Sequence, residues 1–183
     1  MKKILWCIVA VALLLGCREG KVREISIIPQ PQKITETEGT FTFNSKTTIT
    51  EYSDDSTFLN AVSYLQERFG KAAGFKLGCE QTSADDPTAT SGENRIIFRK
   101  DNSLKQEEYK LDITPERIVV ASSAANGAFY AVQTLLQMLP NEIYSNEKRN
   151  CKWSVPCATI EDSPRFSYRG MHLDVCSHFF DTT

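Results

Sequence analysis

The sequence predicts an α+β fold, a mostly antiparallel sheet with two helices packed on one face, formed by residues 25–160. Short segments rich in strand-forming residues alternate with turns, and two longer stretches place apolar residues at helical spacing. Apolar residues make up 41% of the chain and aromatic residues 10%, which is the composition of a protein that folds around a core. A sheet and helices that each have one apolar face bury those faces against each other, so we expect layers.

The first predicted strands lie at the start of this region. Pro29 and Pro31 separate two short extended pieces, and two further pieces consist mainly of Thr, Phe and Ile. The four segments are 25–28, 33–35, 41–43 and 47–50.

The first predicted helix follows these strands. Asp55 or Ser56 can cap its N-terminus, and Gly70 or Gly74 ends it. Its apolar residues recur at helical spacing and predict a face packed in the core. They are Phe58, Val62, Leu65 and Phe69.

The second predicted helix spans about 123–139, and Pro140 stops it. Its apolar face consists of Phe129, Val132, Leu136 and Leu139. Both helices can therefore cover one face of the same sheet.

Polar stretches separate the remaining strands. Residues 79–94 are rich in Ser, Thr, Asp, Pro and Gly and predict a long exposed loop, and residues 141–156 predict a second loop. Pro115 suits the second position of a tight turn and predicts a hairpin between two of the strands. The further strands are 95–98, 109–113, 118–121 and 158–160.

Residues 1–17 have the pattern of a secretory signal. Lys2 and Lys3 precede an apolar run, Ile4–Leu15, that is too short to span a bilayer comfortably. The run ends at Leu14–Cys17, which resembles a bacterial lipobox and implies lipidation of Cys17. We therefore expect an exported lipoprotein of the cell envelope, anchored at a periplasmic or outer-membrane surface, with residues 18–24 as a tether. The alternative is an ordinary signal peptide with an incidental cysteine.

Net charge and the histidine and cysteine residues bear on nucleic-acid binding, metal binding and disulfide formation. The formal net charge is −2 and no basic run occurs, so no nucleic-acid partner is expected. The chain has two histidines and no C-x-x-C pattern, which argues against a zinc site, and no other metal or cofactor is expected. Export permits disulfides among Cys79, Cys151, Cys157 and Cys176. Cys151 and Cys157 could close a small loop, or all four could be separate thiols.

Residues 161–180 contain the chain's last motif. Ser163-Pro164 favours an extended backbone, and residues 168–175 alternate as a strand does. One side carries Arg169, Met171, Leu173 and Val175, and the other carries Tyr168, His172 and Asp174. Bulky groups on both sides predict a strand that is covered on both faces, as in a parallel barrel. The simpler interpretation is a buried strand with an Arg–Asp pair at its rim.

Three stretches resemble glycoside hydrolase family 20, the β-N-acetylhexosaminidases. Residues 162–179 resemble the family's D-x-P-R-F-x-x-R-G-x-x-L-D-x-x-R-H-F, residues 28–32 its opening I-P-x-P, and residues 127–135 its G-x-x-x-G/A-x-Q-T-L helix. The resemblance implies an N-terminal accessory domain at 25–160, followed by the start of a (β/α)8 barrel at 161–183. Such a barrel needs eight strands and about 250 residues, so this start is expected to be incomplete. The chain departs from the motif at Ser177, where the family has Arg, which puts the ion pairing there in doubt.

The resemblance also implies an activity. Family members release terminal β-linked N-acetylglucosamine or N-acetylgalactosamine from glycans by substrate-assisted, retaining hydrolysis, with an Asp-Glu pair in H-x-G-G-D-E. That motif does not occur in this sequence, so no catalytic residue is assigned, and these 183 residues are expected to be an inactive N-terminal fragment.

Site residues come only from the last motif. Arg169 corresponds to the family's sugar-binding arginine, although it lies at the start of the predicted strand, whereas barrel sites lie at strand ends. Asp174 and His178 match family positions near the barrel rim and are further candidates for substrate binding. Structural ion pairing is the alternative role for both, and the preferred one for Asp174. The alternative is a lipid-anchored, non-catalytic carbohydrate-binding or scaffold domain.

Overall fold

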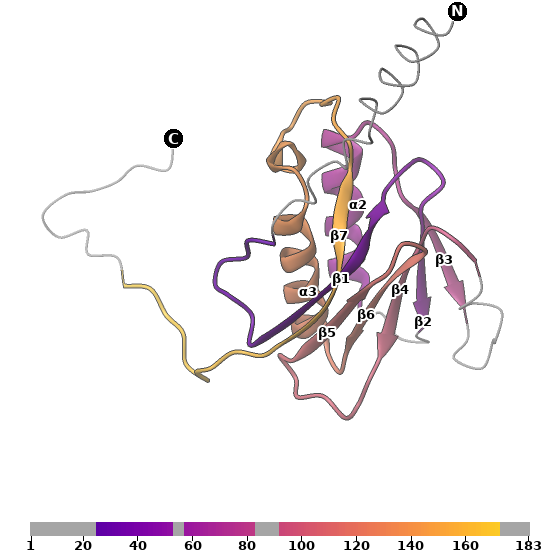
Figure 1. Ribbon diagram of the computed structural model, residues 1–183. Coiled ribbons are helices and arrows are strands. Elements are labelled where there is room, and N and C mark those ends of the chain that lie inside the picture. Colours follow the sequence, from indigo (N-terminus) through magenta and orange to yellow (C-terminus); the bar gives the residue numbers. More distant parts are fainter. Residues whose placement is uncertain (1–24, 53–56, 83–91, 173–183) are drawn as a thin grey trace, which may run out of the picture.

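The computed structural model describes residues 25–52, 57–82 and 92–172, which form a seven-stranded sheet, two α-helices and one 3-10 helix (Figure 1). The strands are β1 (Lys33–Thr42), β2 (Thr48–Tyr52), β3 (Gly78–Thr82), β4 (Arg95–Lys100), β5 (Tyr109–Ile113), β6 (Arg117–Ser122) and β7 (Ser154–Asp162). The helices are α2 (Leu59–Ala72), α3 (Ala125–Met138) and the 3-10 helix η1 (Asn141–Tyr144).

The sheet is mixed, so the prediction of a mostly antiparallel sheet was wrong. The strand order is β1-β7-β5-β6-β4-β2-β3. Strands β1, β7, β5 and β6 pair antiparallel, whereas β6, β4, β2 and β3 pair parallel. The parallel pairing of β2 with β3 follows from α2, which connects these two strands as a crossover and returns the chain in the same direction. The predicted hairpin is confirmed by β5 and β6, where Thr114 N donates to Arg117 O at 2.9 Å.

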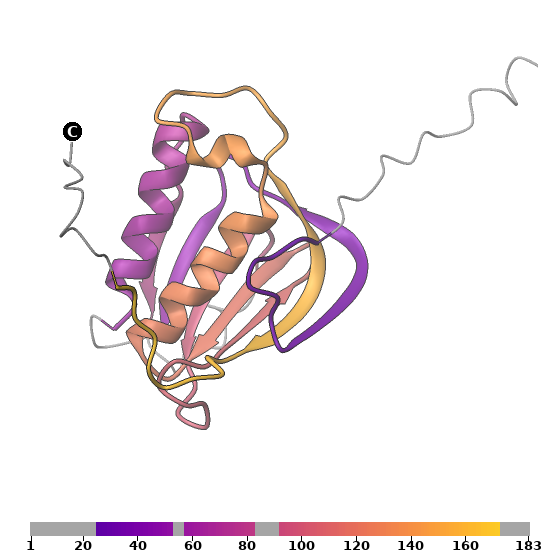
Figure 2. The same ribbon diagram turned by 90° about the vertical axis from the view of Figure 1, so that its left-hand side faces the viewer.

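Both helices lie on one face of the sheet, as predicted (Figures 1 and 2). Helix α2 buries Val62, Leu65 and Phe69 against the sheet, and α3 buries Val132 and Leu136. Of the predicted apolar residues of α3, only Phe129 is partly exposed, and its ring packs on Tyr64 with centroids 5.5 Å apart. Helix α3 ends just before Pro140, and Gly74, which adopts a left-handed φ of +73°, follows the end of α2. Helical spacing therefore identified the core face of both helices.

The sheet supplies the other half of the core. On the face toward the helices, Ile96, Ile118 and Leu111 are fully buried, as are Phe41 and Ile160. An aromatic group lies under α2, where Phe69 contacts the rings of three other residues. They are Phe43, Phe75 and Trp153.

Three strands differ from the prediction in extent. Strand β1 joins two predicted pieces into one strand, with an irregular register between Glu36 and Thr40 opposite β7. Strand β3 occupies the start of the predicted loop 79–94, and β7 starts within the predicted loop 141–156. Polar composition suggested loops at both places. Strand β3 nevertheless forms at the edge of the sheet, and β7 forms because it gains hydrogen bonds from β1 on one side and β5 on the other.

Residues 163–172 follow β7 without forming a strand, so the described part of the predicted strand 168–175 is not one. Tyr168 is 86% exposed and Met171 is 92% exposed, which also excludes a buried strand there. A strand needs a hydrogen-bonded neighbour, and none of the strands in the described residues pairs with this segment.

Candidate functional site

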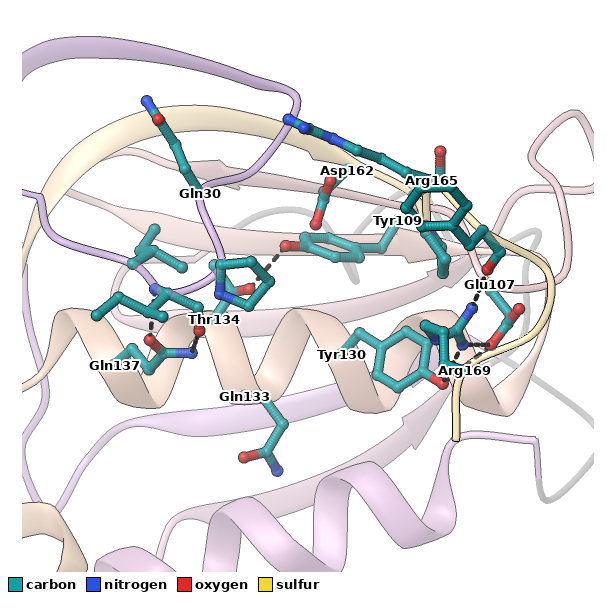
Figure 3. A pocket seen from close by; sticks show the side chains of 16 residues that line it. Gln30, Glu107, Tyr109, Tyr130, Gln133, Thr134, Gln137, Asp162, Arg165 and Arg169 are labelled. Carbon is teal, nitrogen blue, oxygen red and sulfur yellow. Dashed lines mark hydrogen bonds and ion pairs between the residues drawn. The ribbon is translucent and has the colours of Figure 1, made fainter. Parts of the chain in front are cut away.

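A cavity of about 610 Å³ lies beside α3, at the carboxyl end of β7 (Figure 3). Its walls come from the segment before β1, the outer face of α3, the loop before β5 and the segment after β7. Apolar residues form much of the wall, among them Ile27, Ile28, Pro29, Pro164 and Phe166. The polar residues that line it are Gln30, Glu107, Tyr109, Tyr130, Gln133, Thr134, Gln137, Asp162, Ser163, Arg165 and Arg169.

The base of the cavity is a buried pair of hydroxyl groups. The oxygens of Tyr109 and Thr134 lie 2.6 Å apart in a hydrogen bond between β5 and α3. Tyr109 is 2% exposed, and burial raises the pKa of its hydroxyl to about 12. The phenol therefore stays neutral at any physiological pH and acts here as a hydrogen-bonding group.

The segment before β1 is fastened to α3 by one side chain. Gln137 accepts the backbone N–H of Ile28 at 2.9 Å and donates to its carbonyl oxygen at 3.2 Å (Figure 3). Next along the chain, the Ile28–Pro29 peptide bond is cis. These two hydrogen bonds fix the backbone at Ile28 and shape one wall of the cavity.

Arg169 closes the other end of the cavity. Its guanidinium donates to the Glu107 carboxylate in an ion pair, to the Tyr130 hydroxyl at 3.4 Å and to the Phe166 carbonyl at 2.6 Å. Tyr130 also donates to Glu107 at 3.0 Å. The hydrogen bonds from Arg169 and Tyr130 hold the pKa of the Glu107 carboxyl below its ordinary value.

The side chains that line the cavity suit binding or packing, and neither of its carboxylates has the features of a glycosidase general acid. A glycosidase general acid needs a raised pKa, whereas the pKa of Glu107 is lowered. The other lining carboxylate, Asp162, accepts the backbone N–H of Gln32 at 3.1 Å. Within the described ranges, no group of three or more His, Cys, Asp or Glu side chains could hold a metal ion.

The predicted site residues divide into two groups. Arg169 lies at the cavity, and its predicted contact with sugar stays a prediction. Cys17, Asp174 and His178 lie outside the described residues.

Cys79, Cys151 and Cys157 are free thiols, so the loop that a Cys151–Cys157 disulfide would close is open here, and Cys176 lies outside the described residues. In the part of the chain that the structure describes, no helix is long and apolar enough to cross a bilayer.

Sequence reasoning missed the partners of Arg169. Tyr130 lies within the motif at 127–135, so its place beside the last motif could have been suspected. Glu107 lies in a loop that carries no pattern, 62 residues from Arg169. Only the folded chain brings that carboxylate to the guanidinium.

Comparison with known proteins gives a consistent result. The family model described as glycosyl hydrolase family 20, domain 2, matches residues 24–163. A β-hexosaminidase of Porphyromonas gingivalis is 32% identical over 94% of this chain and 22% of its own length. A β-N-acetylhexosaminidase of Cellulomonas fimi is 26% identical over 86% of this chain and 30% of its own length. The chain thus spans less than a third of either relative.

Solved structures agree with the sequence matches. An exo-β-N-acetylglucosaminidase of Vibrio harveyi, in complex with N-acetylglucosamine, has a TM-score of 0.67 at 28% identity. The similarity covers 87% of this chain and 22% of that one. A family 20 β-N-acetylhexosaminidase of Streptomyces coelicolor has a TM-score of 0.69 at 27% identity, over 82% of this chain and 28% of that one.

Proposed function

Because this chain belongs to glycosyl hydrolase family 20, we propose that it is the N-terminal supporting domain of an exo-acting β-N-acetylhexosaminidase. The substrate would be a glycan with a terminal β-linked N-acetylglucosamine or N-acetylgalactosamine, hydrolysed with retention and with help from the substrate's own acetamido group. The observation that carries this proposal is the match of domain 2 of the family to residues 24–163, which contain every described strand and helix.

The domain would support catalysis without supplying the reacting groups. The sequence has no H-x-G-G-D-E motif, and the pKa of Glu107 is shifted away from that of a general acid. Several large apolar side chains on the helical side and after β7 are exposed, as expected for a surface that packs against another domain. They are Ile28, Phe129, Phe166, Tyr168 and Met171.

Further parts of the proposal rest on the sequence. Arg169 would contact the hydroxyls of the terminal sugar, with Asp174 and His178 nearby. Cys17 would carry the lipid that holds the protein at the membrane surface of the cell envelope. Substituting Cys17→Ala should move the protein from the detergent phase to the aqueous phase in a Triton X-114 partition, whereas unchanged partition would refute the anchor.

Hydrolysis of a chromogenic N-acetyl-β-glucosaminide tests the activity. The assay compares the 183-residue chain with the native protein immunopurified by an antibody to residues 25–160. We expect hydrolysis by a native protein well above 20.6 kDa and none by the 183 residues alone. A native protein that binds the sugar but never hydrolyses the glycoside would contradict the proposal.

The cavity beside α3 favours one alternative, a carbohydrate-binding domain without catalysis. It combines an apolar wall with hydrogen-bonding side chains, among them Gln30, Gln133 and Arg165. Calorimetric titration of the chain with N-acetylglucosamine and chitin oligomers tests this alternative. Heat that saturates, and that a Gln133→Ala substitution removes, would support it.

A further inference from the structure

The sheet has a second face, opposite the one that the two helices cover (Figures 1 and 2). Side chains alternate along a strand, so the neighbours of buried, helix-facing residues such as Ile96 and Ile118 point to this outer face. Ile97 and Val119 lie there and form a small apolar cluster apart from the main core. The strand register therefore shows which side chains share the outer face.

Basic side chains outnumber acidic ones on the outer face. At the paired positions of the strands, five cations and three carboxylates point to it, a formal charge of +2, whereas the whole chain carries −2. The cations are Lys33, Arg95, Arg99, Lys110 and Arg117, and the carboxylates are Glu80, Asp112 and Glu161. A surface whose charge is opposite to that of the chain as a whole attracts anions.

The three carboxylates are engaged with neighbours on the same face. Glu80 pairs with Arg95 at 3.4 Å. Glu161 lies between Lys33 and Lys110 in the strand register and pairs with Lys33, at 3.7 Å. The third carboxylate accepts a hydrogen bond from a threonine hydroxyl of β7 at 2.8 Å. The acidic groups of the face are therefore occupied by partners other than two of its cations.

Those two cations, Arg99 of β4 and Lys110 of β5, stand on either side of one small residue. Both pair with Ala121 of β6, and since neighbouring strands lie about 4.8 Å apart, their backbones are about 10 Å apart. Both side chains are exposed, and neither forms an ion pair within the part of the chain that the structure describes. The pKa of nearby Asp101 is lowered by hydrogen bonds from Ser103 and then by the charges of Arg99 and Lys110. Arg99 and Lys110 are thus the cations of this face that can take an external anion.

The rest of the outer face indicates the class of anion. Among the side chains that the structure describes, the large exposed hydrophobic ones all lie elsewhere, whereas a membrane or a protein partner usually meets protruding apolar or aromatic groups. Beside the cations lie the apolar cluster of Ile97 and Val119 and the neighbouring hydroxyls of Thr35 and Thr159. A polysaccharide with acidic groups matches this set, because it offers anions, hydroxyls and the C–H groups of its rings.

We propose that the outer face binds an acidic polysaccharide, with Arg99 and Lys110 contacting carboxylate or sulfate groups along one chain of it. The planar fork of the guanidinium suits a carboxylate or sulfate, and the ammonium of Lys110 adds a second point charge. The outer face lies across the sheet from the helices, so this site is separate from the cavity beside α3. The proposal concerns binding only, and it holds whether or not the chain belongs to an active hexosaminidase.

Affinity electrophoresis of the full chain tests the proposal, in gels that contain chondroitin sulfate, which carries both carboxylate and sulfate groups. Because the chain is negative overall, retardation by a polyanion would report a local basic surface. We expect retardation that weakens as the salt concentration rises, since salt screens exposed charges. Arg99→Gln combined with Lys110→Gln should raise the Kd about fivefold or more.

A matched double variant, Lys76→Gln with Lys152→Gln, removes two exposed lysines outside the strands and the same net charge. It should bind as the unaltered chain does, Arg99→Lys should keep most of the affinity, and all variants should keep the melting temperature because these side chains are exposed. Equal loss of binding in the two double variants, or no retardation of the unaltered chain at low salt, would refute the site. Binding to vesicles of phosphatidylcholine and phosphatidylglycerol that Arg99→Gln with Lys110→Gln abolishes, without retardation by chondroitin sulfate, would refute the polysaccharide and indicate a membrane surface.

Discussion

The layer of sheet and helices and the segment after β7, residues 163–169, which we call the strap, are held by different interactions. Residues such as Phe69, Leu65 and Ile118 are completely buried, and each contributes apolar area and close packing. The strap exposes most of its apolar surface and depends on a few polar contacts with residues far away in the chain. The same polypeptide thus contains a region whose stability is distributed over many residues and a region whose position depends on two or three.

This difference predicts how each region responds to change. In the packed layer, removing side-chain volume lowers the stability of the whole domain. In the strap, removing one contact frees a local segment and leaves the stability of the domain nearly unchanged.

The largest effect should come from Phe69→Ala. The ring of Phe69 packs on Phe43 at a centroid distance of 4.7 Å and on Trp153 at 6.0 Å. Its loss should lower the free energy of unfolding by about 3–5 kcal/mol, measured by urea denaturation. Phe166→Ala removes the same ring from the strap and should cost less than about 0.5 kcal/mol. Equal costs would show that the strap is packed like the core.

A second pair of substitutions compares two glycines in helices. An alanine Cβ at Gly127 of α3 would lie 2.3 Å from the Glu108 carbonyl oxygen, so the helix or the loop must shift. We expect Gly127→Ala to destabilise the fold by about 3 kcal/mol. Gly70→Ala in α2 meets only Lys76, at 3.9 Å, and should stabilise by about 0.5–1 kcal/mol because alanine is the better helix former. Melting temperatures that do not shift in opposite directions for the two variants would contradict this prediction.

The third prediction concerns alkaline pH. Since the folded chain raises the pKa of Tyr109 from 10.0 to about 12, the unfolded chain loses this proton first as pH rises. The domain should therefore be fully stabilised by this group below pH 10 and lose roughly 2–3 kcal/mol between pH 10 and 12. Denaturation of Tyr109→Phe should show a correspondingly smaller decline over the same range. An identical decline in both chains would show that Tyr109 is not the group responsible.

The smallest effect should come from Gln32→Ala, which removes the hydrogen bonds from its side-chain amide to Ser163 at the start of the strap. We expect a change in the free energy of unfolding of only about 0.5 kcal/mol, because these hydrogen bonds are exposed. Hydrogen exchange at 163–166 should nevertheless become faster. Gln30→Ala, which removes another glutamine side chain that lines the cavity, is the matched control. Faster hydrogen exchange in both variants would indicate that the whole cavity wall opens readily to solvent.

The candidate site shows where sequence reasoning succeeded and where it could not. The last motif identified Arg169, and the motif at 127–135 contains Tyr130, because both carry residue patterns that a reader can recognise. Glu107 is an ordinary loop carboxylate and becomes part of the site only through a contact across 62 positions. Contacts of that range are set by strand order, which no local pattern records.

The sequence by itself determined where the two helices lie, most of their buried residues, and which family the chain belongs to. Apolar spacing located α2 and α3 and their buried faces, because the period of a helix is a local property of the chain. Only the tertiary structure decided that half of the sheet is parallel and that Arg169 meets Glu107. Strand direction and long-range ion pairs depend on how the connections cross the sheet, which no local pattern records. The crossover through α2, for example, fixes the directions of β2 and β3 only once the helix has packed on the core.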